Sequence, residues 1–246
     1  MDFVEAGLLV ATGLIAGSLN TLAGGGSMLS VPLLVALGLP GDLANGTNRI
    51  GIFFQSSVAA WRFRRGGIPG LAQSWPLLVP VALGSVIGAW MASRLASAEF
   101  ERIFGVVMIA LLIPLFRKPR KAEAPPAPPW PLGVQAVLFF LIGLYGGFIQ
   151  AGVGLLLMLA LHRTGYDLVR VNSMKVIVVG VLTALAIPVF ILKGQVAWAP
   201  AACLTLGFAL GGAVGARWAL AGGERLIRIA LVIAVLALAG QMLGVY

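Results

Sequence analysis

The sequence predicts an all-α polytopic membrane protein made of two inverted-topology repeats. Each repeat has about four helical segments, and the first two form a glycine-interrupted hairpin. Three observations predict this fold class. Of the 246 residues, 60% are hydrophobic and 10% are charged, and the mean hydropathy of +1.01 is far above that of a soluble domain. Apolar runs near the length of a membrane span recur along the whole chain. The two halves of the chain also resemble each other.

The apolar stretches are of two kinds. Two of them, roughly Phe3–Pro40 and Leu132–His162, are too long for one span and contain glycines, so each is expected to form an interrupted hairpin. The remaining six are the expected single segments, at roughly Ile50–Trp61, Trp75–Ala92, Ile103–Phe116, Val176–Leu192, Ala199–Leu220 and Leu226–Val245.

One hydrophilic stretch, RKPRKAEAPPAPPWP at residues 117–131, separates the halves. Its charges and prolines cannot build a packed core or a span. We expect a cytoplasmic basic linker here, between a first transmembrane repeat at residues 1–116 and a second at residues 132–246.

The similarity of the halves rests on matched polar residues as well as on glycines. GLIAGSLNTLAG matches GLYGGFIQAGVG at a separation of 130 positions, which pairs Asn20 with Gln150 and Gly24 with Gly154. LGSVIGAWMASRLASAEFERI matches LGFALGGAVGARWALAGGERL at a separation of 123 positions, including its Arg and Glu residues. Matched charges at one separation indicate an internal duplication.

The distribution of Lys and Arg favours an inverted duplication. If RFRRGG at residues 62–67 is cytoplasmic, an inverted second half places most basic residues, including those of the linker, on the cytoplasmic side. A parallel repeat loses that bias. Both termini are then expected outside. The net charge of +9 is explained by this topology, so no nucleic-acid partner is predicted.

The triple glycine Gly24-Gly25-Gly26 is predicted to break its helix. Three consecutive glycines would cost a helix interior about 3 kcal/mol relative to alanine, and the short apolar helix that follows is expected to begin with Ser27 as its capping residue. A broken helix can present backbone N–H groups and a positive dipole end to an anion. The second half repeats the design more weakly, with Gly152 and Gly154 flanking the break.

Polar residues follow each predicted hairpin, and each cluster contains one cation. ANGTNRIGIFFQSS holds Arg49, and RVNSMKVIVVG holds Lys175 at the matching position. Cations within a membrane are costly and mark an ion or substrate path, although a cation at a helix end also reaches the headgroups by snorkelling. The match between the halves favours the first interpretation, in which both cations meet near the midplane and hold an anion.

Metal, disulfide and enzyme chemistry find no support. The chain has one cysteine, Cys203, and one histidine, His162, which argues against a metal site or a disulfide framework. It has no hydrolase triad, Walker loop or dinucleotide fingerprint. We therefore expect neither an enzyme nor a cofactor.

The chain resembles the sulfite exporter TauE/SafE family of permeases, also called TSUP. The resemblance rests on GLIAGSLNTLAGGGSMLSVPLL and GDLANGTNRIG in the first half, and on GLYGGFIQAGVG and NSMKVIVV in the second. It departs where Leu155 and Leu156 replace a glycine run. It implies export of small sulfur-containing anions, such as sulfite, thiosulfate or organosulfonates, across the bacterial cytoplasmic membrane.

The prediction is thus a secondary transporter that works by alternating access. Its expected partners are a small anionic substrate, the lipid bilayer and a coupling ion, with H⁺ and Na⁺ as candidates. A passive anion channel and a carrier of carboxylates are the alternatives. The predicted substrate-binding residues are Asn20, Gly24, Gly25, Gly26, Ser27, Asn48, Arg49, Gln55, Gln150, Gly152, Gly154, Asn172, Ser173 and Lys175.

Overall fold

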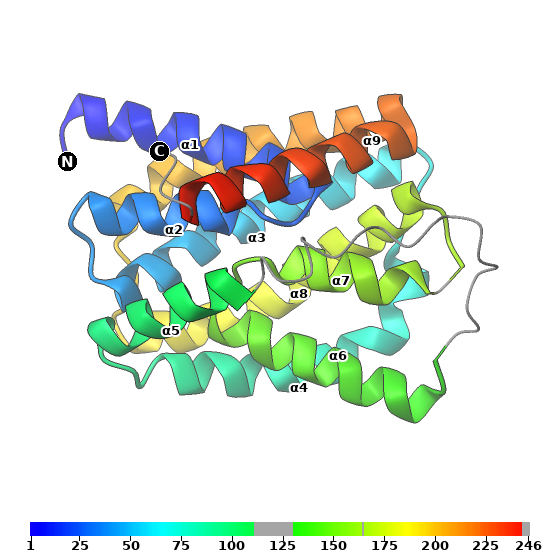
Figure 1. The fold of residues 1–246 in the computed structure, drawn as a ribbon, viewed down its shortest axis with the longest axis horizontal. Coiled ribbons are helices and arrows are strands. Elements are labelled where there is room, and N and C mark those ends of the chain that lie inside the picture. Colours follow the sequence, from blue (N-terminus) through cyan, green and yellow to red (C-terminus); the bar gives the residue numbers. More distant parts are fainter. Residues whose placement is uncertain (111–129, 164, 243–246) are drawn as a thin grey trace.

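A computed structural model describes residues 1–110, 130–163 and 165–242 of the chain. All of the regular secondary structure in these residues is α-helical, as predicted. The helices run roughly along one common direction (Figure 1). In chain order they are α1 (Phe3–Leu22), α2 (Ser27–Ala36), α3 (Gly41–Arg65), α4 (Leu71–Ala92), α5 (Ser97–Ala110), α6 (Leu132–Phe148), α7 (Val153–His162), α8 (Leu168–Leu192) and α9 (Trp198–Met242).

Both predicted interruptions are present. The first long apolar stretch divides into α1 and α2, and the second into α6 and α7. Helices α2 and α7 have 10 residues each, about half of what a bilayer span requires. The predicted linker at residues 117–131 lies outside the described residues except for its last two.

Several helices begin earlier than the apolar runs that predicted them. Helix α3 begins at Gly41 instead of Ile50, and α8 begins at Leu168 instead of Val176. The added turns carry polar residues, among them Asn48 and Asn172, which are buried against other helices. Hydropathy alone therefore placed these turns outside the membrane segments. The last two predicted segments also form one helical element, α9, whose C-terminal part runs back along the molecule in Figure 1.

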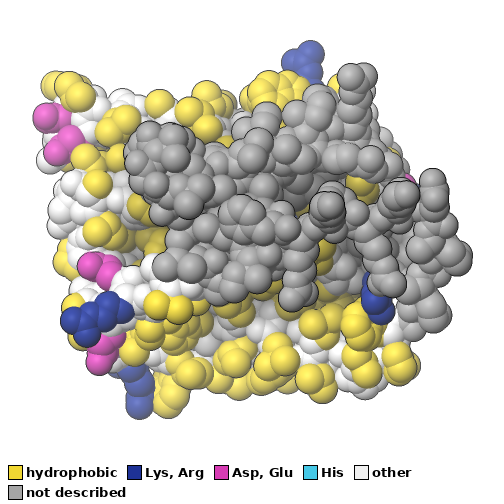
Figure 2. Space-filling model, in the orientation of Figure 1, with side chains coloured by type: hydrophobic (Ala, Val, Ile, Leu, Met, Phe, Trp, Pro, Cys, Tyr) yellow, Lys and Arg dark blue, Asp and Glu magenta, His cyan; other side chains and the backbone are white. Residues whose placement is uncertain are grey.

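Within the described part of the chain, four segments are long and apolar enough to span a bilayer, namely α1, α4, α8 and residues Trp198–Gly222 of α9. Many large apolar side chains on the described surface are exposed, such as Phe3 at 98% and Leu192 at 86%. Hydrophobic side chains also dominate the described part of the face shown in Figure 2. An apolar exterior of this extent fits lipid as the surrounding solvent.

The helix pairs follow the predicted duplication. Helix α1 packs along α9, α6 packs along α4, and α3 and α8 lie against each other. Close approach in the outer pairs depends on glycine, because Gly13 contacts Gly207 and Gly143 contacts Gly84. The repeat matches α1 with α6 and α9 with α4. The pair α1–α9 is therefore the counterpart of the pair α6–α4. This is the packing expected of a twofold relation between the halves.

Candidate functional site

The two helix breaks meet at the centre of the molecule. Helix α1 ends at Leu22, and Gly24 then has a left-handed backbone with a φ of +90°. A Cβ atom on Gly24 would overlap the backbone of Gly154, and one on Gly154 would overlap Gly24. The first break is therefore in direct backbone contact with the residues that directly follow the second break, and glycine is required at both positions.

The second break is not where the sequence match placed it. Gly154 lies inside α7, and the residues with positive φ are Gln150 at 67° and Gly152 at 71°. The reason is helix length. Leu22 ends α1 five residues after Gly17, whereas Phe148 ends α6 one residue after Gly147. The difference of four residues is about one helical turn, so Gly152 caps α7 and Gly154 does not flank the break.

The start of α2 also corrects a prediction. Gly26 is the N-cap residue, it makes no side-chain cap, and Ser27 is the first residue of the helix. A Cβ atom on Gly26 would overlap the Ala16 carbonyl and the Asn20 side chain, so α1 and α2 approach too closely for a capping side chain. The N–H groups of Gly25, Gly26 and Ser27 have no acceptor among the described residues. All three residues are buried.

Arg49 of α3 is fully buried and lies at the end of α6. Its guanidinium donates to the carbonyl oxygens of Gly146 at 3.0 Å, Gly147 at 2.6 Å and Phe148 at 3.3 Å. It also lies 4.6 Å from the ring centroid of Phe190. These carbonyls belong to the last turn of α6, where the helix dipole is negative. A cation of the first half thus caps an interrupted helix of the second half.

Lys175 of α8 makes the reciprocal arrangement. Its side chain is 1% exposed, and its Nζ donates to the carbonyl oxygens of Asn20 at 2.9 Å and Thr21 at 2.6 Å. These carbonyls belong to the last turn of α1. Arg49 and Lys175 are the only buried cations among the described side chains. The partners of both cations in this structure are helix carbonyls. That the two cations also bind an anion directly stays a prediction.

The other predicted polar residues fall into pairs around the breaks. Asn20 donates to Gln55 at 2.6 Å, and Gln55 donates to Thr21 at 2.7 Å. On the other side, Gln150 donates to Thr183 at 2.5 Å. These bonds tie the end of each interrupted helix to a long neighbouring helix, α3 or α8.

Two further predicted residues lie beside this centre. The Ser30 hydroxyl donates to Asn48 at 2.6 Å, which fixes the first turn of α2 on α3. Ser173 is turned elsewhere, because its hydroxyl donates to the Ile68 carbonyl in the α3–α4 connection at 2.7 Å. The hydrogen bonds of five predicted residues thus lie at the breaks, whereas that of Ser173 does not; the five are Asn20, Arg49, Gln55, Gln150 and Lys175.

Some buried polar side-chain atoms have no hydrogen-bond partner among the described residues. Both amide atoms of Asn172 are unpaired although the residue is 0% exposed, and Gln150 Oε1, Ser56 Oγ and Arg49 Nε are unpaired as well. Asn172 lies one turn before Lys175 on α8. Unpaired buried amides are rare and call for a ligand, a water or an ion.

Sequence reasoning missed three residues of this site. Asn45 donates to the Phe148 carbonyl at 3.1 Å and lies one turn before Arg49, a spacing that could have indicated its role. Thr21 and Thr183 accept hydrogen bonds from the two glutamines. An isolated threonine in an apolar helix gives no such signal.

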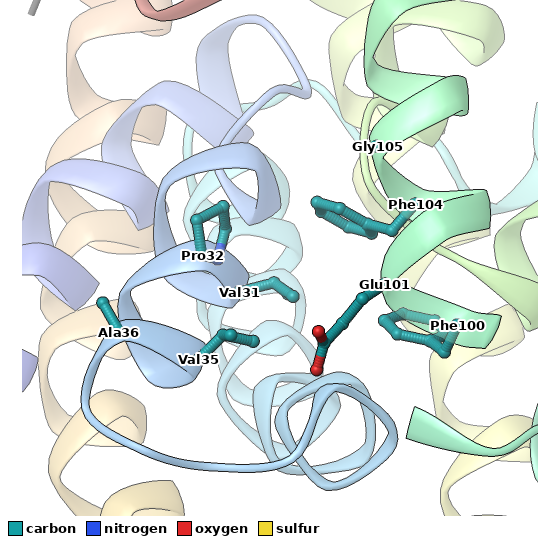
Figure 3. A pocket seen from close by; sticks show the side chains of 8 residues that line it. All are labelled: Val31, Pro32, Val35, Ala36, Phe100, Glu101, Phe104 and Gly105. Carbon is teal, nitrogen blue, oxygen red and sulfur yellow. The ribbon is translucent and has the colours of Figure 1, made fainter. Parts of the chain in front are cut away.

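Four cavities in the described residues are lined by none of the predicted site residues. Figure 3 shows one of 350 Å³ between α2 and α5, lined mainly by apolar residues such as Val31, Val35 and Phe104. Its carboxylate, Glu101, accepts a hydrogen bond from the Gly41 N–H at 3.1 Å. The described residues also hold no cluster of His, Cys, Asp and Glu that could bind a metal ion.

Comparison with known proteins identifies the family. The family model described as sulfite exporter TauE/SafE matches residues 9–242. A probable membrane transporter protein, ORF9, of Sinorhizobium is 29% identical over 96% of this chain and 91% of its own length.

Two other relatives are similar over comparable lengths. A probable membrane transporter protein of Haemophilus influenzae is 25% identical over 92% of this chain and 89% of its own length. The probable membrane transporter protein YfcA of Escherichia coli K12 is 25% identical over 96% and 89%. No solved structure matches the chain significantly. The chain therefore belongs to the sulfite exporter TauE/SafE family of membrane transporters.

Proposed function

We propose that this membrane transporter is a secondary carrier that exports a small sulfur-containing oxyanion, such as sulfite, thiosulfate or an organosulfonate, by alternating access. The substrate binds at the contact between the two helix breaks. The observation that carries the proposal is the pair of fully buried cations, Arg49 and Lys175, at the ends of the interrupted helices, with no buried carboxylate among the described side chains.

The charge balance supports an anionic substrate. Among the described side chains no Asp or Glu is buried. The salt bridge found in the described residues joins the N-terminal amino group to Glu5, far along the chain from both buried cations. Buried charges in proteins are normally paired, because removing an ion from water costs several kcal/mol. The carbonyls that Arg49 and Lys175 bind supply partial charges only. An anion at the breaks would supply the missing negative charge.

The backbone supports the same location. The unpaired N–H groups of Gly25, Gly26 and Ser27 lie at the positive end of the α2 dipole. Such a helix start binds phosphate, sulfate and carboxylate groups in many proteins. The free amide of Asn172 adds a side-chain donor in a region that is closed to water. A compact oxyanion can accept from several of these groups at once.

Sulfur in particular is supported by the family description, which names sulfite export. Transport by a carrier is favoured over a passive channel because the backbones of Gly24 and Gly154 are in contact. A closed contact between two interrupted hairpins must separate before a substrate passes. Relative movement of two repeats around a fixed site is the general behaviour of carriers with this architecture.

The test is flux of radiolabelled or fluorescently detected anions in proteoliposomes. Sulfite, thiosulfate, sulfate, sulfoacetate, aromatic sulfonates and matched carboxylates are compared, and Arg49→Gln and Lys175→Gln are expected to abolish flux of the sulfur anion. Arg94→Gln, which changes an exposed cation, is the matched control and keeps its flux.

The outcomes separate the alternatives. Saturable flux that can be driven by a gradient of a second ion supports the carrier. Flux that grows linearly with concentration indicates an anion channel, and a response to carboxylates alone shows the wrong substrate class. Full flux in both neutral variants would overturn the proposed site.

A further inference from the structure

The crossed contacts of the two buried cations have a consequence for ion coupling. In carriers with interrupted helices, the carbonyl oxygens at the end of the first half-helix commonly coordinate a coupling Na⁺. Here these oxygens are occupied. Lys175 Nζ binds the carbonyls of Asn20 and Thr21, and Arg49 binds those of Gly146, Gly147 and Phe148.

We infer that Arg49 and Lys175 are positioning residues that take the place of a coupling Na⁺ at the interrupted helices. Arg49 of the first half binds the end of α6 in the second half, and Lys175 of the second half binds the end of α1 in the first half. Na⁺ therefore has no role at these carbonyls. The inference rests on the proposed function only for transport itself, because the contacts of the two cations are made within the chain.

The contacts support a fixed cation at each break. Both side chains are buried to 1% exposure or less, so water does not compete for their donors. The Asn20 and Thr21 carbonyls lie in the last turn of α1, where an uncapped buried carbonyl would be costly. At the other break, Asn45 assists Arg49, since its amide also donates to the Phe148 carbonyl. Each cation thus completes the hydrogen bonding of a helix end in the opposite half.

The crossing distinguishes this role from direct substrate binding. Loss of a substrate ligand would weaken anion binding but leave both breaks closed. Loss of a positioning cation would open the break of the opposite half in the absence of any substrate. Lys175→Ala is therefore expected to expose the end of α1, and Arg49→Ala the end of α6.

The first experiment measures this exposure in purified protein without substrate. A cysteine is placed at Ala23 or at Ile149 in a Cys203→Ser background, and both positions are buried in the structure. Lys175→Ala is expected to increase the rate of thiol labelling at position 23 and not at position 149. Arg49→Ala is expected to give the reverse. Lys193→Ala, which removes an exposed lysine at the end of the same helix, changes neither rate.

The second experiment is chemical rescue of the vacated position. Na⁺ or methylammonium should raise the melting temperature of Lys175→Ala by about 3–6 °C at a concentration tenfold above its dissociation constant. The wild-type protein should melt at the same temperature in Na⁺ and in N-methylglucamine. Lys175→Arg, which keeps a cation, should resemble the wild type.

Specific stabilisation of the wild type by Na⁺, or equal labelling of both breaks in each variant, would overturn the inference. If Lys175→Ala does not fold, the sodium comparison on the wild type and the labelling of Lys175→Arg still decide it. None of these measurements includes a sulfur anion, and chloride is the counter-ion throughout. A failure to transport sulfur anions would therefore overturn the proposed function and leave this inference standing.

Discussion

The contact between Gly24 and Gly154 allows the cost of a single methyl group to be predicted. Gly24→Ala places a Cβ atom at a φ of +90° and against the backbone of Gly154. The left-handed backbone costs roughly 1–2 kcal/mol for a non-glycine residue. Overpacking of a closed interior costs typically 1–3 kcal/mol. The sum is a loss of about 2–5 kcal/mol in the free energy of unfolding.

Gly38→Ala is the matched control. Gly38 has a φ of +89°, but a Cβ atom there would meet nothing within 4 Å. It should therefore lose only the conformational part, roughly 1–2 kcal/mol. Reversible denaturation in detergent micelles measures both losses. Equal losses in the two variants would refute the reasoning, because they would show that the two breaks do not press on each other.

Four further predictions use the same measurement of unfolding free energy. Asn45→Leu should lower the free energy of unfolding by about 1–3 kcal/mol, because it leaves the Phe148 carbonyl with one donor fewer. Asn172→Leu should leave the free energy of unfolding unchanged or raise it, while it lowers the affinity for the anion. A large loss of stability in Asn172→Leu would show that the amide has a structural partner. Gln150→Gly should be about 1–2 kcal/mol more stable than Gln150→Ala, since only glycine relieves the positive φ, and identical stability would argue against strain at this residue. Gly143→Leu should separate α4 from α6 and lower the free energy of unfolding by at least about 1–3 kcal/mol. Gly133→Leu is the control, because Gly133 lies in open space on the same helix and the larger side chain should be tolerated. Unchanged stability of Gly143→Leu would contradict the close packing of α4 and α6.

The membrane class, the helical fold and both interruptions followed from composition and from glycine placement. These features are local, or depend on a pattern that repeats along one helix. Such features can be predicted from the sequence because they depend on residues that are close together in the chain.

The crossed roles of Arg49 and Lys175 could not be predicted in the same way. The sequence indicated that both are buried and related, but their partners are backbone carbonyls some 100 to 150 residues away in the chain. A carbonyl has no residue type, so no motif marks it. The register of the second break failed for a related reason. Matching Gly24 to Gly154 aligned two glycines that touch each other in space, although they do not occupy equivalent positions in their helices.

The extra turn at the end of α1 bears on the energetics of a transport cycle. In a carrier made of two identical inverted halves, the states open to either side of the membrane would be interconverted by exchanging the halves, so their free energies would be equal. Helix α1 extends five residues past Gly17 and α6 extends one past Gly147. This single turn removes the equivalence. The resting protein is then free to favour one orientation before any substrate or ion gradient acts on it.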